Sequence, residues 1–207
     1  MGLFLLERHR RSTGEATTDF LQGDPQNVGD APRCEVCGSF IGMLRWEPLL
    51  RAEIETWGTK LGDLAFGPGD SFLVSERFKA LWERERLVGL HGFEPIEVVK
   101  VRHRGKRIKD GPPQYVRVFV SRSAVALDQE RSGIQWTTPP TCSACREGRG
   151  LKGWERIVLE AEPLEDLFEA RGLPGQVLAS ERFKRFCEEH AITNCPLVPA
   201  ERASHWF

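Results

Sequence analysis

The segment Ser75-Glu-Arg-Phe-Lys79 occurs again 105 residues later as Ser180-Glu-Arg-Phe-Lys184. Two motifs upstream of it repeat at an offset of 108 residues: Cys34-Glu-Val-Cys37 with Cys142-Ser-Ala-Cys145, and Trp46-Glu47 with Trp154-Glu155. These matches indicate an internal duplication, with a three-residue deletion between the two sets of motifs. Each half of the sequence can therefore be used to judge the other.

The duplication predicts an α+β fold made of two pseudo-repeated lobes in one integrated domain. The expected divisions are an N-terminal strand and loop over 1–33, a first repeat over 34–98, a hairpin and connector over 99–141, and a second repeat over 142–207. Apolar runs predict strands in matched places of the two repeats. They cover Met43–Leu50 and Gly153–Glu160 around the tryptophans, and later Phe93–Val99 and Pro196–Ala200.

Each repeat is expected to contain one capped helix. Ser75 and Ser180 are predicted N-caps, because a serine hydroxyl can accept a hydrogen bond from a free N–H of the first turn. An apolar face with helical spacing follows each cap. Its members are Phe78, Leu81 and Trp82 in the first repeat, and Phe183, Phe186 and Cys187 in the second. Gly89 and Asn194 are expected just past the helix ends, since both residue types tolerate the left-handed conformation of a C-cap.

The segment from Val98 to Val120 has no counterpart in the second half of the sequence. Its two alternating stretches around a Gly/Pro loop predict a β-hairpin. The first arm and tip carry six basic residues, which are Lys100, Arg102, Arg104, Lys106, Arg107 and Lys109. They fit either a solvated edge strand or an electropositive arm that binds an acidic partner or a phosphate backbone.

The two CxxC pairs predict one structural zinc site with the ligands Cys34, Cys37, Cys142 and Cys145. A CxxC loop directs two thiolates at one ion, and two such loops complete a tetrahedral four-sulfur site. The wide separation of the pairs follows if each repeat contributes one loop, here called a knuckle. Redox dithiols are the rival reading, but they favour a CxxC that begins a helix after a buried strand, whereas glycine-containing loops follow both pairs.

The other two cysteines are expected to belong to the apolar core. At the 105-residue offset, Cys187 aligns with Trp82 and Cys195 aligns with Leu90. Free cysteine behaves as a small apolar residue when it is buried. The sequence therefore assigns metal chemistry to the four knuckle cysteines alone.

Composition and motifs favour a binding protein over an enzyme. The 207-residue chain is 40% hydrophobic and 29% charged and has a net charge of −1, which gives no global reason to bind nucleic acid or an anionic membrane. Its five histidines lie outside the common catalytic motifs. A closed four-thiolate zinc site also leaves no position for substrate. The apolar start is too short for a signal peptide, so a cytoplasmic protein without a membrane span is expected.

Together these motifs resemble the myxobacterial double-CXXCG paralogous family. The resemblance covers nearly the whole chain and rests on the two knuckles, both Ser-Glu-Arg-Phe-Lys segments, Gly92-Phe-Glu-Pro95 and Trp154-Glu-Arg-Ile-Val158. One departure is Arg146, where the second motif of the family has glycine. The family is similar to immunity proteins of the swarming-inhibition (SitI) type. The resemblance implies a cytoplasmic immunity protein that binds and neutralises a cognate toxin encoded by a neighbouring gene.

A second class of function stays open at this point. A zinc-ribbon protein could use the basic arm as a nucleic-acid-binding or regulatory adaptor. Generic affinity for DNA or RNA with a steep salt dependence would favour the adaptor. A tight complex with the product of the adjacent gene would favour immunity.

Overall fold

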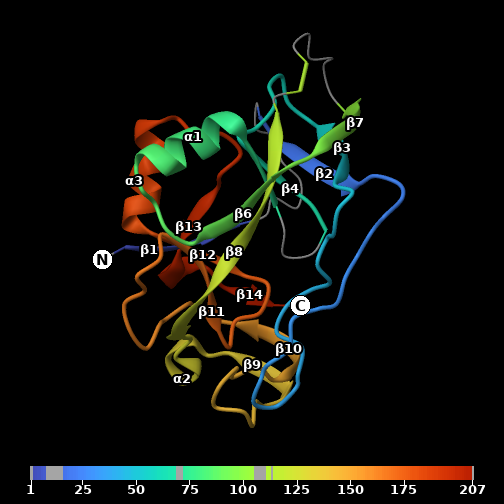
Figure 1. Cartoon of the computed structure of the whole chain (residues 1–207). Helices are drawn as coiled ribbons and strands as arrows, with labels where there is room; N and C mark the ends of the chain where they lie inside the picture. Colours follow the sequence, from blue (N-terminus) through green and yellow to red (C-terminus); the bar gives the residue numbers. More distant parts are fainter. Residues whose placement is uncertain (1, 8–15, 69–71, 105–110, 113, 207) are drawn as a thin grey trace.

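The computed structural model describes residues 2–7, 16–68, 72–104, 111–112 and 114–206. This part of the chain is α+β, as predicted; it contains many strands and three short α-helices, one more than the sequence analysis expected (Figure 1). The strands of the main sheet are β1 (Leu3–Leu6), β2 (Thr18–Gln22), β3 (Arg51–Thr56), β4 (Leu64–Phe66), β5 (Phe72–Ser75), β6 (Leu90–Pro95), β7 (Glu97–His103), β8 (Tyr115–Ala126), β11 (Leu167–Arg171), β12 (Val177–Ser180) and β13 (Leu197–Pro199). A smaller sheet contains β9 (Gln135–Thr138), β10 (Arg149–Trp154) and β14 (His205–Trp206). The helices are α1 (Glu76–Arg84), α2 (Gln129–Ser132) and α3 (Glu181–Glu189), with the 3-10 turn η1 (Ala200–Arg202).

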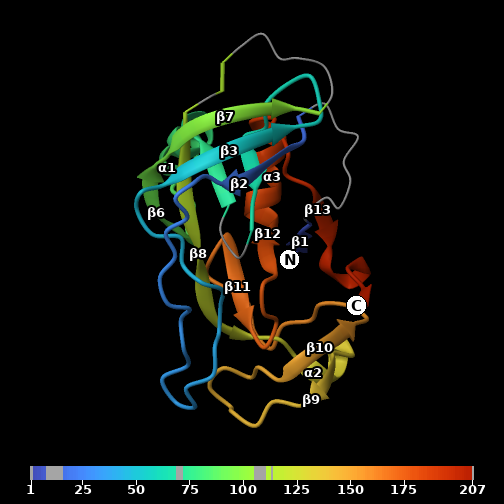
Figure 2. The ribbon, with the colours of Figure 1, turned by 90° about the vertical axis from the view of Figure 1, so that its right-hand side faces the viewer.

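The eleven-stranded main sheet runs in the order β13-β1-β12-β11-β8-β5-β4-β2-β3-β7, and β6 pairs with β8 beside this path. Most neighbours are antiparallel, but β11–β8, β2–β4 and β3–β7 are parallel. Figures 1 and 2 show β2, β3 and β7 at one end of the molecule and β9 and β10 at the other. The segment between β2 and β3 runs from the first end to the second and back, which brings the first knuckle to the small sheet.

Both predicted N-caps are confirmed. The Ser75 Oγ accepts a hydrogen bond from the Phe78 amide at 3.1 Å, and the Ser180 Oγ accepts one from the Phe183 amide at the same distance. The apolar faces of α1 and α3 pack against each other, and the two helices lie side by side in Figure 1. Their ring centroids are 5.6 Å apart between Phe78 and Phe186 and 6.0 Å apart between Trp82 and Phe183. The predicted helix faces therefore form one shared aromatic core.

The helices end earlier in the sequence than predicted. Left-handed residues close the helices earlier, at Arg86 (φ 52°) and Ala191 (φ 46°). After α1, the Arg86 amide donates to the Glu83 carbonyl and the next amide donates to the Trp82 carbonyl; the same two bonds follow α3. This is the Schellman arrangement, which satisfies the last helix carbonyls. Gly89 and Asn194 also have positive φ, at 115° and 56°, but they lie in the loops beyond.

The strand predictions around the tryptophans are also wrong in their bounds. Trp46 forms only an isolated bridge with Val28, and β3 begins after Pro48, which has no N–H to donate to a ladder. In the second half, β10 ends at Trp154, because the following two amides bond to the Ser132 carbonyl instead of to a strand. The two later strand predictions lie close to observed strands. The prediction over Phe93–Val99 falls on the end of β6 and the start of β7, and the prediction over Pro196–Ala200 contains β13.

The predicted hairpin over Val98–Val120 is not formed. β7 pairs in parallel with β3, from Arg51 opposite Glu97 to Thr56 opposite His103. β8 pairs instead with β5, β6 and β11. An alternating pattern indicates a strand but does not specify which strand it pairs with. Here Val98 and Val101 of β7 pack against the apolar cluster that contains Ala52 and Ile54 of β3, which favours pairing with β3. Residues 105–110, where the tip of the predicted hairpin would fall, lie outside the described residues.

β8 also has a structural counterpart, contrary to the expectation that its segment is present once. Its first part lies between β5 and β6, with Tyr115 opposite the cap Ser75. β1 lies in the same way between β12 and β13, with Leu3 opposite the cap Ser180. Thus β1, from the start of the first half, completes the sheet around β12 and β13 of the second half. In turn β8, which follows the first repeat, completes the sheet around β5 and β6 of the first half. Sequence matching missed this correspondence because Leu3–Leu6 and Tyr115–Val118 share only their apolar and extended character.

Candidate metal centre

The four predicted ligand cysteines converge on one point. The Sγ atoms of Cys34 and Cys142 are 4.0 Å apart, and those of Cys37 and Cys145 are 3.7 Å apart. All four sulfur atoms lie within 4.8 Å of one another. Four thiolates around one ion, each at about 2.3 Å, would stand roughly 3.8 Å apart at tetrahedral geometry. The quartet therefore fits a metal ion in both chemistry and dimensions.

The two knuckles have the same backbone turn. The Gly38 amide donates to the Cys34 carbonyl at 2.8 Å, and the Arg146 amide donates to the Cys142 carbonyl at 2.9 Å. Both residues are left-handed, Gly38 with φ 73° and Arg146 with φ 60°. Arginine replaces glycine in the second knuckle at a conformational cost of about 1 to 2 kcal/mol. Its side chain forms an ion pair with Glu160, and its carbonyl accepts from the Gln129 amide group at 2.9 Å.

Two arginines that the sequence analysis missed join the knuckles to the main sheet. Arg122, on β8, donates to the Ile41 carbonyl beyond the first knuckle and pairs with Glu147 beyond the second. Arg171, at the end of β11, donates to the Ala144 carbonyl within the second CxxC loop at 3.0 Å. A divalent ion with four thiolates carries a net charge of −2, so the guanidinium group of Arg171 also favours it electrostatically, whereas the charge of Arg122 is matched by Glu147. No sequence motif marks either arginine, because each reaches the knuckles only through the pairing of strands that are far apart in the sequence.

The metal-free thiols have very different proton affinities. Hydrogen bonds from the side chain and backbone of Ser39 lower the pKa of the exposed Cys37 thiol to about 6. Burial raises the pKa of the Cys145 thiol to about 12. Four ionised sulfurs at this spacing would repel one another strongly without a cation. A bound divalent ion would remove that repulsion and hold all four sulfurs as thiolates.

An open cavity of about 470 Å³ lies beside the second knuckle, and Cys142, Arg146 and Glu160 are among its lining residues. Cys142 is half-buried and Cys37 is exposed, whereas Cys34 and Cys145 are buried. The quartet is therefore accessible from one side and enclosed on the other. An ion could reach it from this side without opening either core.

The six basic residues predicted to bind a partner do not form one exposed patch in the described part of the chain. Arg102 pairs with Glu53 and Arg104 pairs with Glu55, both on the neighbouring strand β3. Lys100 is exposed on β7. Lys106, Arg107 and Lys109 lie outside the described residues. Two of the six charges are thus matched by carboxylates within the protein.

Exposed apolar side chains lie along the segment that carries the first knuckle instead. Residues 27–49, here called the knuckle arm, fold back on themselves through backbone bonds from Gly29 to Arg45, from Glu47 to Asn27 and from Ile41 to Pro32. Of the twelve large hydrophobic side chains exposed in the described residues, six lie on this arm. They are Val28, Val36, Phe40, Met43, Leu44 and Leu49.

Comparisons with known proteins do not name a family: no family model matches the chain, and a search of curated proteins finds no match. Among the described residues, no helix has both the length and the apolar character needed to cross a bilayer. The site itself therefore carries the functional argument.

Proposed function

We propose that this protein is a cytoplasmic immunity protein that binds and neutralises a cognate toxin, with a structural zinc ion bracing the binding surface. The exposed apolar side chains of the knuckle arm are the observation that carries this proposal. Large apolar patches on a protein surface commonly mark contacts with other proteins. The similarity of the cysteine and Ser-Glu-Arg-Phe motifs to SitI-type immunity proteins supports the choice of a toxin as partner.

Zinc fits the donor set better than other common metals. Four thiolates in tetrahedral array are soft donors that select zinc or iron, and the two-knuckle form is typical of structural zinc. Four protein ligands would fill the coordination sphere, so the ion would have a structural role. We propose that it links the two repeats of a duplicated chain, since each repeat contributes one knuckle.

The metal would make the arm a pre-organised surface. Cys34 and Cys37 lie within the arm, so coordination would fix its tip against the second knuckle. At its base, Trp46 is buried and stacks on Phe20, with ring centroids 5.5 Å apart. A segment held at both ends loses little conformational entropy on binding, and this favours tight association. Immunity to a toxin requires such a tight complex.

The basic residues have a smaller part in this proposal. Arg102 and Arg104 are paired with glutamates, so they add little field at a distance. Lys100, and Lys106, Arg107 and Lys109 outside the described residues, could still steer an acidic partner toward the protein. The pairing of Arg102 and Arg104 weakens the alternative of a nucleic-acid adaptor, which needs several free charges against phosphate.

Co-expression with the toxin encoded by the neighbouring gene tests the proposal. Cells that carry the wild-type protein should grow, and cells that carry the double variant Phe40→Ser, Leu44→Ser should not. Leu164→Ser is the matched control, because Leu164 is 93% exposed but lies outside the arm. The control should protect as well as wild type, and all variants should keep their fold and metal content.

Retained protection and affinity in the arm variant would remove the arm from the binding surface. No binding to the adjacent gene product, together with salt-dependent binding to DNA or RNA, would favour the adaptor instead.

A further inference from the structure

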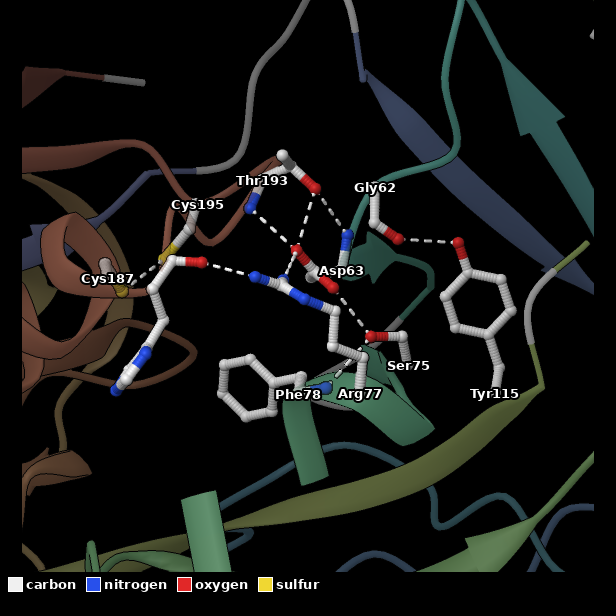
Figure 3. Close-up of polar contacts among 10 residues, drawn as sticks. Gly62, Asp63, Ser75, Arg77, Phe78, Tyr115, Cys187, Thr193 and Cys195 are labelled. Atoms are coloured by element: carbon white, nitrogen blue, oxygen red, sulfur yellow. Dashed lines mark hydrogen bonds and ion pairs between the residues drawn. The ribbon is translucent and has the colours of Figure 1, made fainter. Parts of the chain in front are cut away.

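Two thiols outside the metal centre are in contact with each other. Cys187 lies in the last turn of α3, and Cys195 lies two residues before β13. Their Sγ atoms are 3.5 Å apart. Figure 3 shows both side chains near Asp63 and the polar residues that bind its carboxylate. A disulfide needs the two sulfurs at about 2.05 Å, so a shift of about 1.5 Å separates this contact from a bond.

Packing alone does not require two cysteines at this place. The aligned residues of the first half, Trp82 and Leu90, belong to the same apolar cluster as Cys187, and Cys195 packs against that cluster. Apolar side chains therefore suffice at both positions. The second half differs by having two sulfurs in contact, which adds a chemistry that tryptophan and leucine lack.

The nine residues from Cys187 to Cys195 include the main contacts between α3's end and the first half of the chain. The His190 carbonyl accepts a bond from Arg77, and the amide and hydroxyl of Thr193 both donate to the Asp63 carboxylate at 3.0 Å (Figure 3). The Asn194 side chain donates to the Thr18 carbonyl at 2.7 Å and to the Leu64 carbonyl at 2.8 Å. A bond across the base of this loop would hold all of these contacts in place.

We propose that Cys187 and Cys195 form a reversible disulfide when the protein meets hydrogen peroxide or an organic hydroperoxide. One thiolate attacks a peroxide oxygen, the O–O bond breaks, and the cysteine becomes a sulfenic acid while water, or an alcohol, leaves. The second thiol then loses its proton and attacks this sulfur, forming the S–S bond and releasing water. Two thiols and one hydrogen peroxide thus give one disulfide and two water molecules.

The reaction should be slow. A hydrogen bond with Cys187 and burial both raise the pKa of Cys195, and the thiolate is the reactive form. Cys187 is buried, so only a small oxidant can approach the pair. The disulfide would therefore record sustained oxidation. It does not depend on the proposed immunity function.

Peptide mapping of the oxidised full-length protein tests the proposal. The zinc-loaded chain is treated with hydrogen peroxide, free thiols are alkylated, and the digest is analysed without reductant. We expect a peptide linked through Cys187 and Cys195 that disappears after thiol reduction, with the zinc content unchanged. Closure of a nine-residue loop should also raise the melting temperature by about 5 to 10 °C.

Cys187→Ala and Cys195→Ala are the matched controls, and each should lose both the linked peptide and the rise in melting temperature. The mapping of the wild-type chain stands even if a variant folds poorly. The proposal is overturned if both thiols remain fully alkylatable after oxidation. It is also overturned if the knuckle cysteines oxidise and release zinc before the Cys187–Cys195 link forms.

Discussion

Replacing Asp63 by alanine should destabilise the protein by about 2 to 5 kcal/mol, because this buried carboxylate holds three groups at once. It accepts hydrogen bonds from the cap Ser75, from Arg77 and from Thr193 (Figure 3). Loss of the acceptor for the Thr193 amide should cost about 1 to 3 kcal/mol, and loss of the Ser75 bond about 0.5 to 1.5 kcal/mol. Arg77 is half exposed, so its ion pair adds only about 0.2 to 1 kcal/mol.

The second half of the chain provides an internal comparison. Asp166 accepts from the cap Ser180, from Arg182 and from the Val88 amide, each at 3.0 Å. Arg182 also donates a hydrogen bond to the Glu85 carbonyl at the end of α1. Arg77 likewise donates one to the His190 carbonyl at the end of α3. Asp166→Ala should therefore cost about as much as Asp63→Ala. Asp63→Asn should cost less, because the amide oxygen can still accept from Thr193.

Thermal unfolding of the metal-loaded protein measures these effects. A loss of 2 to 5 kcal/mol corresponds to a fall in melting temperature of roughly 5 to 20 °C for a chain of this size. Asp30→Ala, at an exposed position, is the control and should change stability by less than about 0.5 kcal/mol. The reasoning fails if Asp63→Ala matches this control, or if Asp63 matters and Asp166 does not.

Three further predictions concern the metal, the single tyrosine and Arg102 on β7. Metal analysis should find one zinc ion per chain, and Cys142→Ser should lower the melting temperature more than Cys187→Ala, which should cost about 1 to 3 kcal/mol; equal effects would contradict the assignment. Tyr115 donates to the Gly62 carbonyl, and burial raises its pKa well above the usual value, so the folded state favours the neutral phenol. This contribution is complete below about pH 10 and declines above it, and tyrosinate absorbance near pH 10 in the folded protein would refute it. Arg102→Ser should cost no more than about 1 kcal/mol in denaturant unfolding, since its pair with Glu53 is partly exposed; a loss above 2 kcal/mol would show a structural role that its exposure does not suggest.

The features that the sequence predicted well depend on a few neighbouring residues. A serine followed by Glu-Arg-Phe-Lys defines a cap and the first helical turn whatever lies elsewhere, and both caps are present. The cysteine quartet was predictable because each CxxC loop directs two thiolates at one ion, and two such loops complete a tetrahedral site. In both cases the chemistry of a short motif is enough.

The features that the sequence did not predict depend on distant partners. β7 has the pattern of a hairpin strand, but its neighbour is β3, about fifty residues earlier in the chain. Arg122 and Arg171 hold the knuckles from strands that carry no cysteine motif. Arg77 and Arg182 belong to the repeated motif, yet their bonds to the opposite half follow only from the packing of α1 on α3. Such contacts exist only once the whole sheet has assembled.

The exchange of β1 and β8 between the two halves sets a constraint on synthesis. β1 leaves the ribosome early, but its partners, residues 178–180 and 197–199, are made much later. Until then, both edges of an apolar strand stay open, and open edges invite association with other chains. In the first half, β5 and β6 wait less time for their shared partner, because β8 follows soon after them in the chain. A nascent chain would thus complete the sheet around β8 first and would have to keep β1 unpaired until β12, α3 and β13 emerge.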